Sequence, residues 1–176
     1  MCKVTSSAAR NGFTLIELVT VLLIVGVLAY FAMPKLTRST FDQKALGDKV
    51  INDIEYARKY GVAARRYVCI RTTTTAITFT YVVPQPEASG GTLCGGTTAT
   101  EQPITLPAPD SNCGGNTNQV CAPSGYSLSS GAATLIFDDT GSTTSATAGN
   151  SIQFTATTGS TTLTLATVEG ITGYVH

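Results

Sequence analysis

Cysteine is the residue type in this chain with the clearest chemistry to offer. The five cysteines are Cys2, Cys69, Cys94, Cys113 and Cys121. Thiols of this number either form disulfides in an oxidising compartment or bind a soft metal such as zinc. Zinc is disfavoured, because the chain has no C-x-x-C pair and His176 is its single histidine. We therefore expect disulfides and no bound metal.

Groups that could catalyse a reaction are scarce. A Ser/His/Asp or Cys/His mechanism needs a general base, and His176 is the single imidazole. The neighbouring acids Asp138 and Asp139 would point to opposite faces of a strand, so a turn or a solvated edge is the simpler interpretation. The paired glycines at 90–91 and 95–96 lack the Lys-Ser/Thr that follows in a phosphate-binding loop. The sequence predicts a protein that is not an enzyme and uses no cofactor.

A lone carboxylate in an apolar run is the second unusual chemical feature. The 21 residues from Phe13 to Met33 would span roughly 30 Å as a helix, the thickness of a bilayer's hydrocarbon core. Glu17 is the one charge in this run, and it would cost roughly 2.5–3.5 kcal/mol at mid-membrane without a partner. Cleavage between Gly12 and Phe13 would create an α-amine four residues before Glu17, on the same helix face. The helix dipole also favours a carboxylate there.

The geometry of that pair favours a partner on another molecule. A chain closes a bond between its own α-amine and Glu17 imperfectly, because its first helical turn must bend. A neighbouring copy, offset along the helix axis, can supply the amine instead. Glu17 would then set the register between packed helices.

The stretch Gly12-Phe13-Thr14-Leu15-Ile16-Glu17 follows a basic leader and begins an apolar helix that contains Gly26 and ends near Pro34. This arrangement closely resembles the prepilin signature of type IV pilins and type II secretion pseudopilins. The resemblance implies that a prepilin peptidase cleaves after Gly12 and methylates the amine of Phe13. It also implies that Glu17 guides the subunit into a helical filament with other pilins or pseudopilins, built at an inner-membrane assembly platform.

Three simpler interpretations of the apolar run compete. A secretory signal peptide also places basic residues before an apolar core, but Glu17 interrupts this core. A membrane anchor that is never processed needs only the length observed. A buried core helix is less favoured, because the run is apolar on all faces.

Charge predicts the orientation of the chain. Residues 1–12 carry Lys3 and Arg10 and no acid, which would keep this end cytoplasmic and place the rest in the periplasm, after a single pass through the inner membrane. Removing this leader also removes Cys2 and leaves four cysteines in an outward-facing domain, where disulfides persist. Four cysteines allow three pairings. We favour a local clasp between Cys113 and Cys121, and a longer link between Cys69 and Cys94.

The remaining residues predict an α+β fold, in which the second half of a long helix packs on antiparallel strands. Residues 41–66 place Leu46, Val50, Ile54 and Ala57 at helical spacing. Pro34 should kink the helix before this stretch, and Gly26 is a second soft point. Alternation predicts a hairpin of 67–71 with 76–83, and later strands at 126–128, 134–137, 151–155, 162–168 and 172–175. Residues 84–125 read as an irregular excursion with one short strand at 104–106.

These expectations divide the chain into four parts. They are a leader at 1–12, a transmembrane or filament-core helix at 13–34, an amphipathic helix half at 35–66, and a β-rich, disulfide-bearing head at 67–176. The segments 135–141, 171–175 and 55–66 resemble parts of the minor pseudopilins of the GspH/FimT group, and MSHA-type minor pilins are similar. The excursion has no counterpart in that resemblance.

A basic cluster raises a second function. Tyrosines alternate with cations near the end of the predicted helix, and clustered cations attract phosphates. Cations at a helix C-terminus also suit its dipole, and no Lys or Arg follows Arg71. DNA binding is therefore the weaker alternative to a structural or assembly role, together with adhesion. Its candidate contacts are Arg58, Lys59, Arg65, Arg66 and Arg71.

Overall fold

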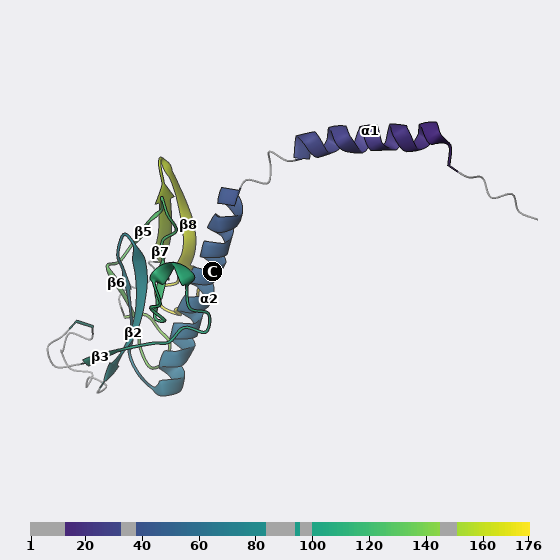
Figure 1. Ribbon diagram of the computed structural model, residues 1–176. Helices are drawn as coiled ribbons and strands as arrows, with labels where there is room; N and C mark the ends of the chain where they lie inside the picture. Colours follow the sequence, from purple (N-terminus) through teal and green to yellow (C-terminus); the bar gives the residue numbers. More distant parts are fainter. Residues whose placement is uncertain (1–12, 33–37, 84–93, 96–99, 145–150) are drawn as a thin grey trace, which may run out of the picture. The chain divides into compact units, whose positions relative to one another are not determined.

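Figure 1 shows a computed structural model of the chain, which describes residues 13–32, 38–83, 94–95, 100–144 and 151–176. The expected leader at 1–12, its cleavage at Gly12 and the kink at Pro34 lie outside these residues. Contacts divide the chain into residues 1–41 and residues 42–176. We call the second unit the head and describe each unit by itself.

Two helices dominate the N-terminal half of the sequence. Helix α1 covers Leu15–Ala32 and helix α2 covers Arg38–Ala64. Within the residues that are described, no helix has both the length and the apolar character needed to cross a membrane. Helix α1 continues without a break through Gly26, so the bend expected there stays a prediction.

The predicted apolar stripe of α2 is confirmed. Leu46, Val50, Ile54 and Ala57 are all buried, the last three completely. They face a core that both β-sheets complete, and Figure 1 shows α2 lying alongside the two sheets. The burial of this stripe is what joins the helix to the head.

The larger sheet contains five strands in antiparallel pairs. These are β1 (Val68–Thr72), β2 (Ala76–Val83), β3 (Thr100–Pro103), β4 (Gln119–Cys121) and β6 (Thr134–Phe137). The order is β3-β2-β1-β6, and β4 also pairs with β2. The predicted hairpin therefore forms as β1 and β2, and strand 134–137 forms as β6.

The smaller sheet has the order β5-β7-β8, from Ser127–Ser130, Ile152–Thr158 and Thr161–Val168. Phe154 pairs with Ala166 but Thr155 pairs with Thr164, so Leu165 is an extra residue in a β-bulge. Leu165 and Ala166 are consequently both buried. The expected strand 172–175 reduces to one isolated bridge, between Val168 and Val175.

The excursion is more ordered than the sequence predicted. Its strand is β3 rather than 104–106, and it also contains β4 and a short 3₁₀ helix, η2 (Ser111–Cys113). Both ends of the segment 104–118 are hydrogen-bonded to the same residue of β2, Phe79. The Phe79 carbonyl accepts from Ile104 N at 3.1 Å, and Phe79 N donates to the Asn118 carbonyl at 2.9 Å. Ile104 and Leu106 are buried without strand pairing, which explains why their apolar pattern resembled a strand.

The helix followed by antiparallel sheets confirms the predicted α+β class. The core unites α2 with both sheets, and its largest buried side chains are aromatic. Phe79, Phe137 and Phe154 are each at most 1% exposed. A single continuous core of this kind makes the head one cooperative unit.

Two glycines of α2 lie against the strands, at different distances. A Cβ on Gly61 would lie 2.9 Å from Cγ2 of Val68 and 3.0 Å from the carbonyl oxygen of Arg66. A Cβ on Gly47 would lie 3.5 Å from the carbonyl oxygen of Leu165 in the bulge, an ordinary contact distance. Gly61 is therefore required by packing, whereas Gly47 leaves room for a methyl group.

Candidate functional site

The start of α1 holds the lone carboxylate, Glu17, in a defined position. Thr14 precedes the helix and caps it, because its side-chain oxygen accepts from Glu17 N at 3.3 Å. The Thr14 carbonyl also accepts from Glu17 N at 3.1 Å and from Leu18 N at 3.2 Å. Glu17 is therefore the third helical residue, where the dipole favours a negative charge. Sequence reasoning missed Thr14, although Thr-x-x-Glu before an apolar run is a recognisable capping pattern.

The apolar side chains of α1 are open on every side. Each large apolar residue from Phe13 to Tyr30 is at least 46% exposed, and Phe13 itself is 82% exposed. No atom lies within 4 Å of a Cβ placed on Gly26. A helix with no polar face is stable only when something apolar covers it. Residues 13–32 do not provide that cover by themselves.

Arg58, one of the candidate DNA contacts, is held by two backbone carbonyls of the head. Its Nε donates to the carbonyl of Gly141 at 2.8 Å, and its Nη2 donates to the carbonyl of Thr172 at 2.9 Å. A Cβ on Gly173 would lie 2.3 Å from the Gly141 carbonyl oxygen, and Gly173 has a φ of +64°. Arg58 therefore joins α2 to two turns that pass very close to each other.

Lys59 and Arg71 are also engaged within the head. Lys59 Nζ lies 2.8 Å from a carboxylate oxygen of Glu55, one helical turn away. Arg71 binds both carboxylate oxygens of Glu101, and the hydrogen bonds to this carboxylate raise the pKa of the guanidinium. Three of the five predicted DNA contacts thus have partners in the fold.

Arg65 and Arg66 end helix α2 and are the two remaining members of the cluster. Arg65 N donates to the Val62 carbonyl at 3.3 Å, and Arg66 N donates to the Gly61 carbonyl at 2.9 Å. This pair of bonds is a Schellman motif, with Arg65 in the left-handed position at a φ of 50°. In the part of the chain that the structure describes, neither guanidinium forms an ion pair.

Three tyrosine rings lie near this helix end. Tyr60 contacts Tyr56 with ring centroids 6.5 Å apart, and it contacts Tyr81 of β2 at 5.4 Å. Burial and the neighbouring Tyr81 raise the pKa of the Tyr60 hydroxyl, while Arg66 opposes that change. These rings are half-buried at the junction of α2 with the sheet, so their packing has a structural role whether or not they bind a ligand.

The four cysteines of the head form two disulfides. Cys69 bonds Cys94, with Cα atoms 6.0 Å apart, and Cys113 bonds Cys121, with Cα atoms 5.4 Å apart. This is the pairing that the sequence favoured. The first disulfide joins β1 to residues 94–95, and the second closes η2 onto β4.

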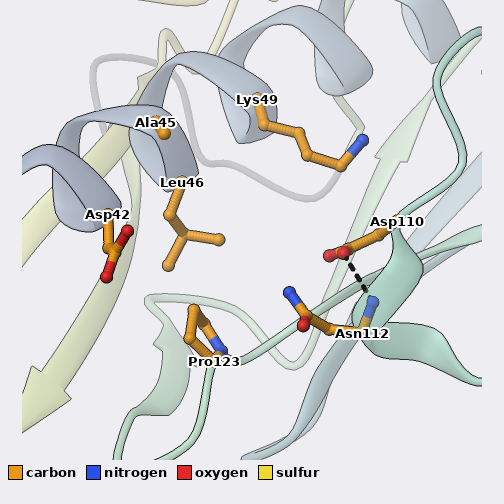
Figure 2. Close-up of a pocket in the computed structure, with 7 residues that line it drawn as sticks. All are labelled: Asp42, Ala45, Leu46, Lys49, Asp110, Asn112 and Pro123. Carbon is orange, nitrogen blue, oxygen red and sulfur yellow. Dashed lines mark hydrogen bonds between the residues drawn. The ribbon is translucent and has the colours of Figure 1, made fainter.

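A hollow of about 330 Å³ lies between α2 and the segment around η2 (Figure 2). Asp42 and Lys49 line it from the helix, and Asp110, Asn112 and Pro123 line it from the other side. Asp110 has structural partners, because its carboxylate accepts from Asn112 N and from Cys121 N, each at 3.0 Å. No cluster suited to a metal ion occurs among the residues that are described.

Beside this hollow, Asp53 is almost completely buried. Lys49 Nζ forms an ion pair with its Oδ2 at 3.0 Å. Desolvation raises the pKa of Asp53 and outweighs the attraction of Lys49. Lys49 also donates to the Ala108 carbonyl. Lys49 thus ties α2 to the 104–118 segment.

Comparisons with known proteins point to the N-terminal region. The comparison with curated proteins found no match. Among solved structures, the crystal structure of the type IV minor pilin FimU from Pseudomonas aeruginosa PAO1 is similar, with a TM-score of 0.44 and 11% identity. The match covers 78% of this chain and 89% of that one. A family model described as the prokaryotic N-terminal methylation motif matches residues 7–32. The chain therefore carries, over residues 7–32, the type IV pilin-like signal that the sequence predicted.

Proposed function

We propose that this protein is a subunit of a helical filament, either a minor pilin of a type IV pilus or a pseudopilin of a type II secretion pseudopilus. The observation that carries this proposal is the combination of the methylation motif at residues 7–32 with the exposed apolar surface of α1. A bilayer covers such a helix before assembly, and the helices of other subunits cover it afterwards.

Processing and assembly follow from the first turn of α1. A prepilin peptidase cleaves after Gly12 and methylates the amine of Phe13. Thr14 caps the helix through a backbone bond and leaves the exposed Glu17 side chain to an external partner. The α-amine of a neighbouring pilin or pseudopilin is the cation that matches it. The subunit is delivered to the filament by an inner-membrane assembly platform.

Location follows from the same residues. We assign 13–34 to a single pass through the bacterial inner membrane, with the helix half 35–66 and the β-rich residues 67–176 in the periplasm until the subunit enters the filament. The two disulfides of the head suit an oxidising compartment. Disulfides are rare in the cytoplasm, where thiols are kept reduced.

The mature amino terminus provides the test. Mass spectrometry of the protein from membranes and from sheared filaments should find N-methylated Phe13 as the first residue. Glu17→Ala protein should be processed in the same way but should reach filaments at least about tenfold less, because the amine of the neighbour loses its partner. An intact Met1, a start at Tyr30, or normal assembly of Glu17→Ala would each refute the proposal.

A binding module presented by the same stem is the second candidate, for DNA uptake or adhesion. The observation in its favour is the pair of cations that follows α2, Arg65 and Arg66, of which Arg66 lies close enough to influence the Tyr60 hydroxyl. Cations beside aromatic rings can hold a phosphate backbone and stack a base. Against it, Arg58, Lys59 and Arg71 already have partners in the head.

DNA retention by the full chain in detergent separates the two candidates. Arg65→Ala with Arg66→Ala should abolish salt-dependent retention if the second candidate holds. The matched control is Lys44→Ala with Lys59→Ala, which removes the same charge from exposed positions of α2. If the protein retains no DNA, or if retention falls equally in both double variants, DNA binding is refuted and the assembly role remains as the candidate function.

A further inference from the structure

The carboxylate of Glu101 lies at the centre of a polar cluster that joins three strands to the residues beside a disulfide. Its side chain is 16% exposed, although β3 is a short strand at the edge of the sheet. Arg71 of β1 binds both of its oxygens. Thr80 of β2 donates to Oε2 at 2.8 Å, and Gly95 N donates to Oε1 at 2.7 Å.

Strand register places this cluster and the disulfide on one face of the sheet. Cys69 pairs with Thr80, and Glu101 pairs with Val82, two residues farther along β2. Residues two apart on a strand share a face, so the side chains of Cys69, Thr80 and Glu101 point the same way. The opposite face carries Tyr81, which contacts Tyr60 of α2. The polar cluster therefore lies away from the helix.

The bond from Gly95 is the link between the cluster and Cys94. The N–H group that donates to Glu101 is part of the peptide bond between Cys94 and Gly95. Gly95 has a φ of +81°, and a Cβ there would lie 3.3 Å from Nη2 of Arg71. The backbone next to Cys94 is thus held against the guanidinium–carboxylate pair in a conformation that glycine adopts easily.

Loop lengths decide which contact forms more readily. Gly95 and Glu101 are six residues apart, whereas Cys69 and Cys94 are separated by 25. A short loop loses less conformational entropy on closing than a long one. Once β1, β2 and β3 pair, the carboxylate can fix Cys94 near Cys69 before any covalent bond exists.

We propose that Glu101, held by Arg71 and Thr80, is a positioning residue for oxidative folding, which brings Cys94 to Cys69 and disfavours its pairing with Cys113 or Cys121. In vitro, glutathione disulfide can serve as the oxidant. One cysteine thiolate attacks it to form a mixed disulfide and release one glutathione thiolate. The second cysteine thiolate then displaces the other glutathione, so the protein loses two electrons and the oxidant gains them.

A thiol–disulfide equilibrium measures this role directly. The processed full-length chain in detergent is equilibrated with reduced and oxidised glutathione, alkylated, and mapped by mass spectrometry. Each disulfide then yields an effective concentration of its two thiols. In Glu101→Gln protein, the value for Cys69–Cys94 should fall at least about tenfold, because a charge-assisted cluster is lost. The value for Cys113–Cys121 should not change.

The second disulfide serves as an internal reference, and two further variants complete the design. Glu55→Gln removes a partly exposed carboxylate from the Lys59 pair and should change neither value. Arg71→Lys keeps the charge but loses the two-pronged contact, and should give a smaller fall for Cys69–Cys94. Equal values in wild-type and Glu101→Gln protein would overturn the proposal. A parallel fall of both disulfides would also overturn it, because Glu101 would then act on the whole head.

Discussion

The two helices of this chain use apolar side chains in opposite ways. Helix α1 exposes its apolar residues all round and carries one carboxylate in its first turn. Helix α2 confines its apolar residues to one stripe, which is buried against the sheets, and covers the rest with charged and polar groups. Helix α2 is therefore stabilised by its own head, whereas the apolar surface of α1 has no cover from the other residues of its own unit.

This difference separates the stability of the molecule from its assembly. Substitutions in α2 act on the folding of the head, because they alter a core that α2 shares with fourteen buried side chains on the described strands of the two sheets. Substitutions in α1 act on whatever covers that helix. Four predictions test how complete this separation is, and each uses unfolding of the full chain in detergent, followed by near-ultraviolet circular dichroism of the tyrosines.

The largest expected effect is on the buried stripe. Ile54→Ala removes a completely buried side chain and should lower the free energy of unfolding of the head by roughly 2–5 kcal/mol. Leu22→Ala deletes a comparable side chain from α1, where it is 63% exposed, and should leave that free energy unchanged. A loss of head stability in Leu22→Ala protein would show that the two helices are not independent.

Arg58 should come next. Arg58→Ala leaves the carbonyls of Gly141 and Thr172 without their donors and should destabilise the head by about 2 kcal/mol. Lys59→Ala, the adjacent cation, loses only an exposed ion pair and should change stability by less than about 0.5 kcal/mol. Similar losses for both would mean that the two carbonyl bonds contribute little.

The two interior glycines of α2 should respond to the same substitution with opposite signs. Gly61→Ala forces a methyl group against Val68 and should destabilise the head by roughly 1–2 kcal/mol. Gly47→Ala meets the backbone of Leu165 at an ordinary distance and should stabilise it by up to about 1 kcal/mol through helix propensity. Stability measured by urea titration decides; a common sign would show that packing at the two positions is alike.

The smallest effect is the acid response of Glu101. Hydrogen bonds from Arg71, Thr80 and Gly95 lower the pKa of Glu101 to about 2. Its contribution is complete above its unfolded pKa near 4.5 and is lost as the pH falls from there towards 2. Between pH 6 and pH 3, wild-type protein should lose on the order of 1 kcal/mol more than Glu101→Gln protein, since the pair is partly exposed.

Asp53 works in the opposite direction over part of that range. The pKa of Asp53 is raised in the folded state, so its ionisation disfavours the fold. Its contribution to stability is complete below the unfolded pKa of 3.8 and is lost as the pH rises through the pKa of the folded state. The comparison of wild-type with Glu101→Gln protein cancels this term, because Asp53 is present in both. If the two proteins lose the same stability in acid, the Arg71–Glu101 pair contributes nothing to it.

Local periodicity made much of the fold predictable. The stripe from Leu46 to Ala57 and the alternation over 76–83 each depend on residues that are close in sequence, so α2 and the β1–β2 hairpin could be read directly. Strand β4 could not be predicted in this way. Its three residues show no period, and they are extended only because β2 continues past the end of β3.

Site residues, too, could be predicted where a local pattern marks them and could not where their contacts are distant in sequence. Glu17 stood out as the single charge in an apolar run, and the methylation motif matches that region. The role of Arg58 was hidden, because its acceptors are backbone carbonyls 83 and 114 positions away. No residue type marks a carbonyl acceptor in a sequence, so Arg58 looked like a cation free to bind phosphate.

Segment 104–118 has a consequence for how this head can vary. Because its two ends meet the N–H and the carbonyl of one residue, Phe79, its length does not affect the register of any strand. Doubling such a loop adds only about 0.6 kcal/mol of closure entropy. An insertion into this segment would therefore leave the strand register unchanged, provided that it preserves the Cys113–Cys121 disulfide and the bond of Lys49 to the Ala108 carbonyl.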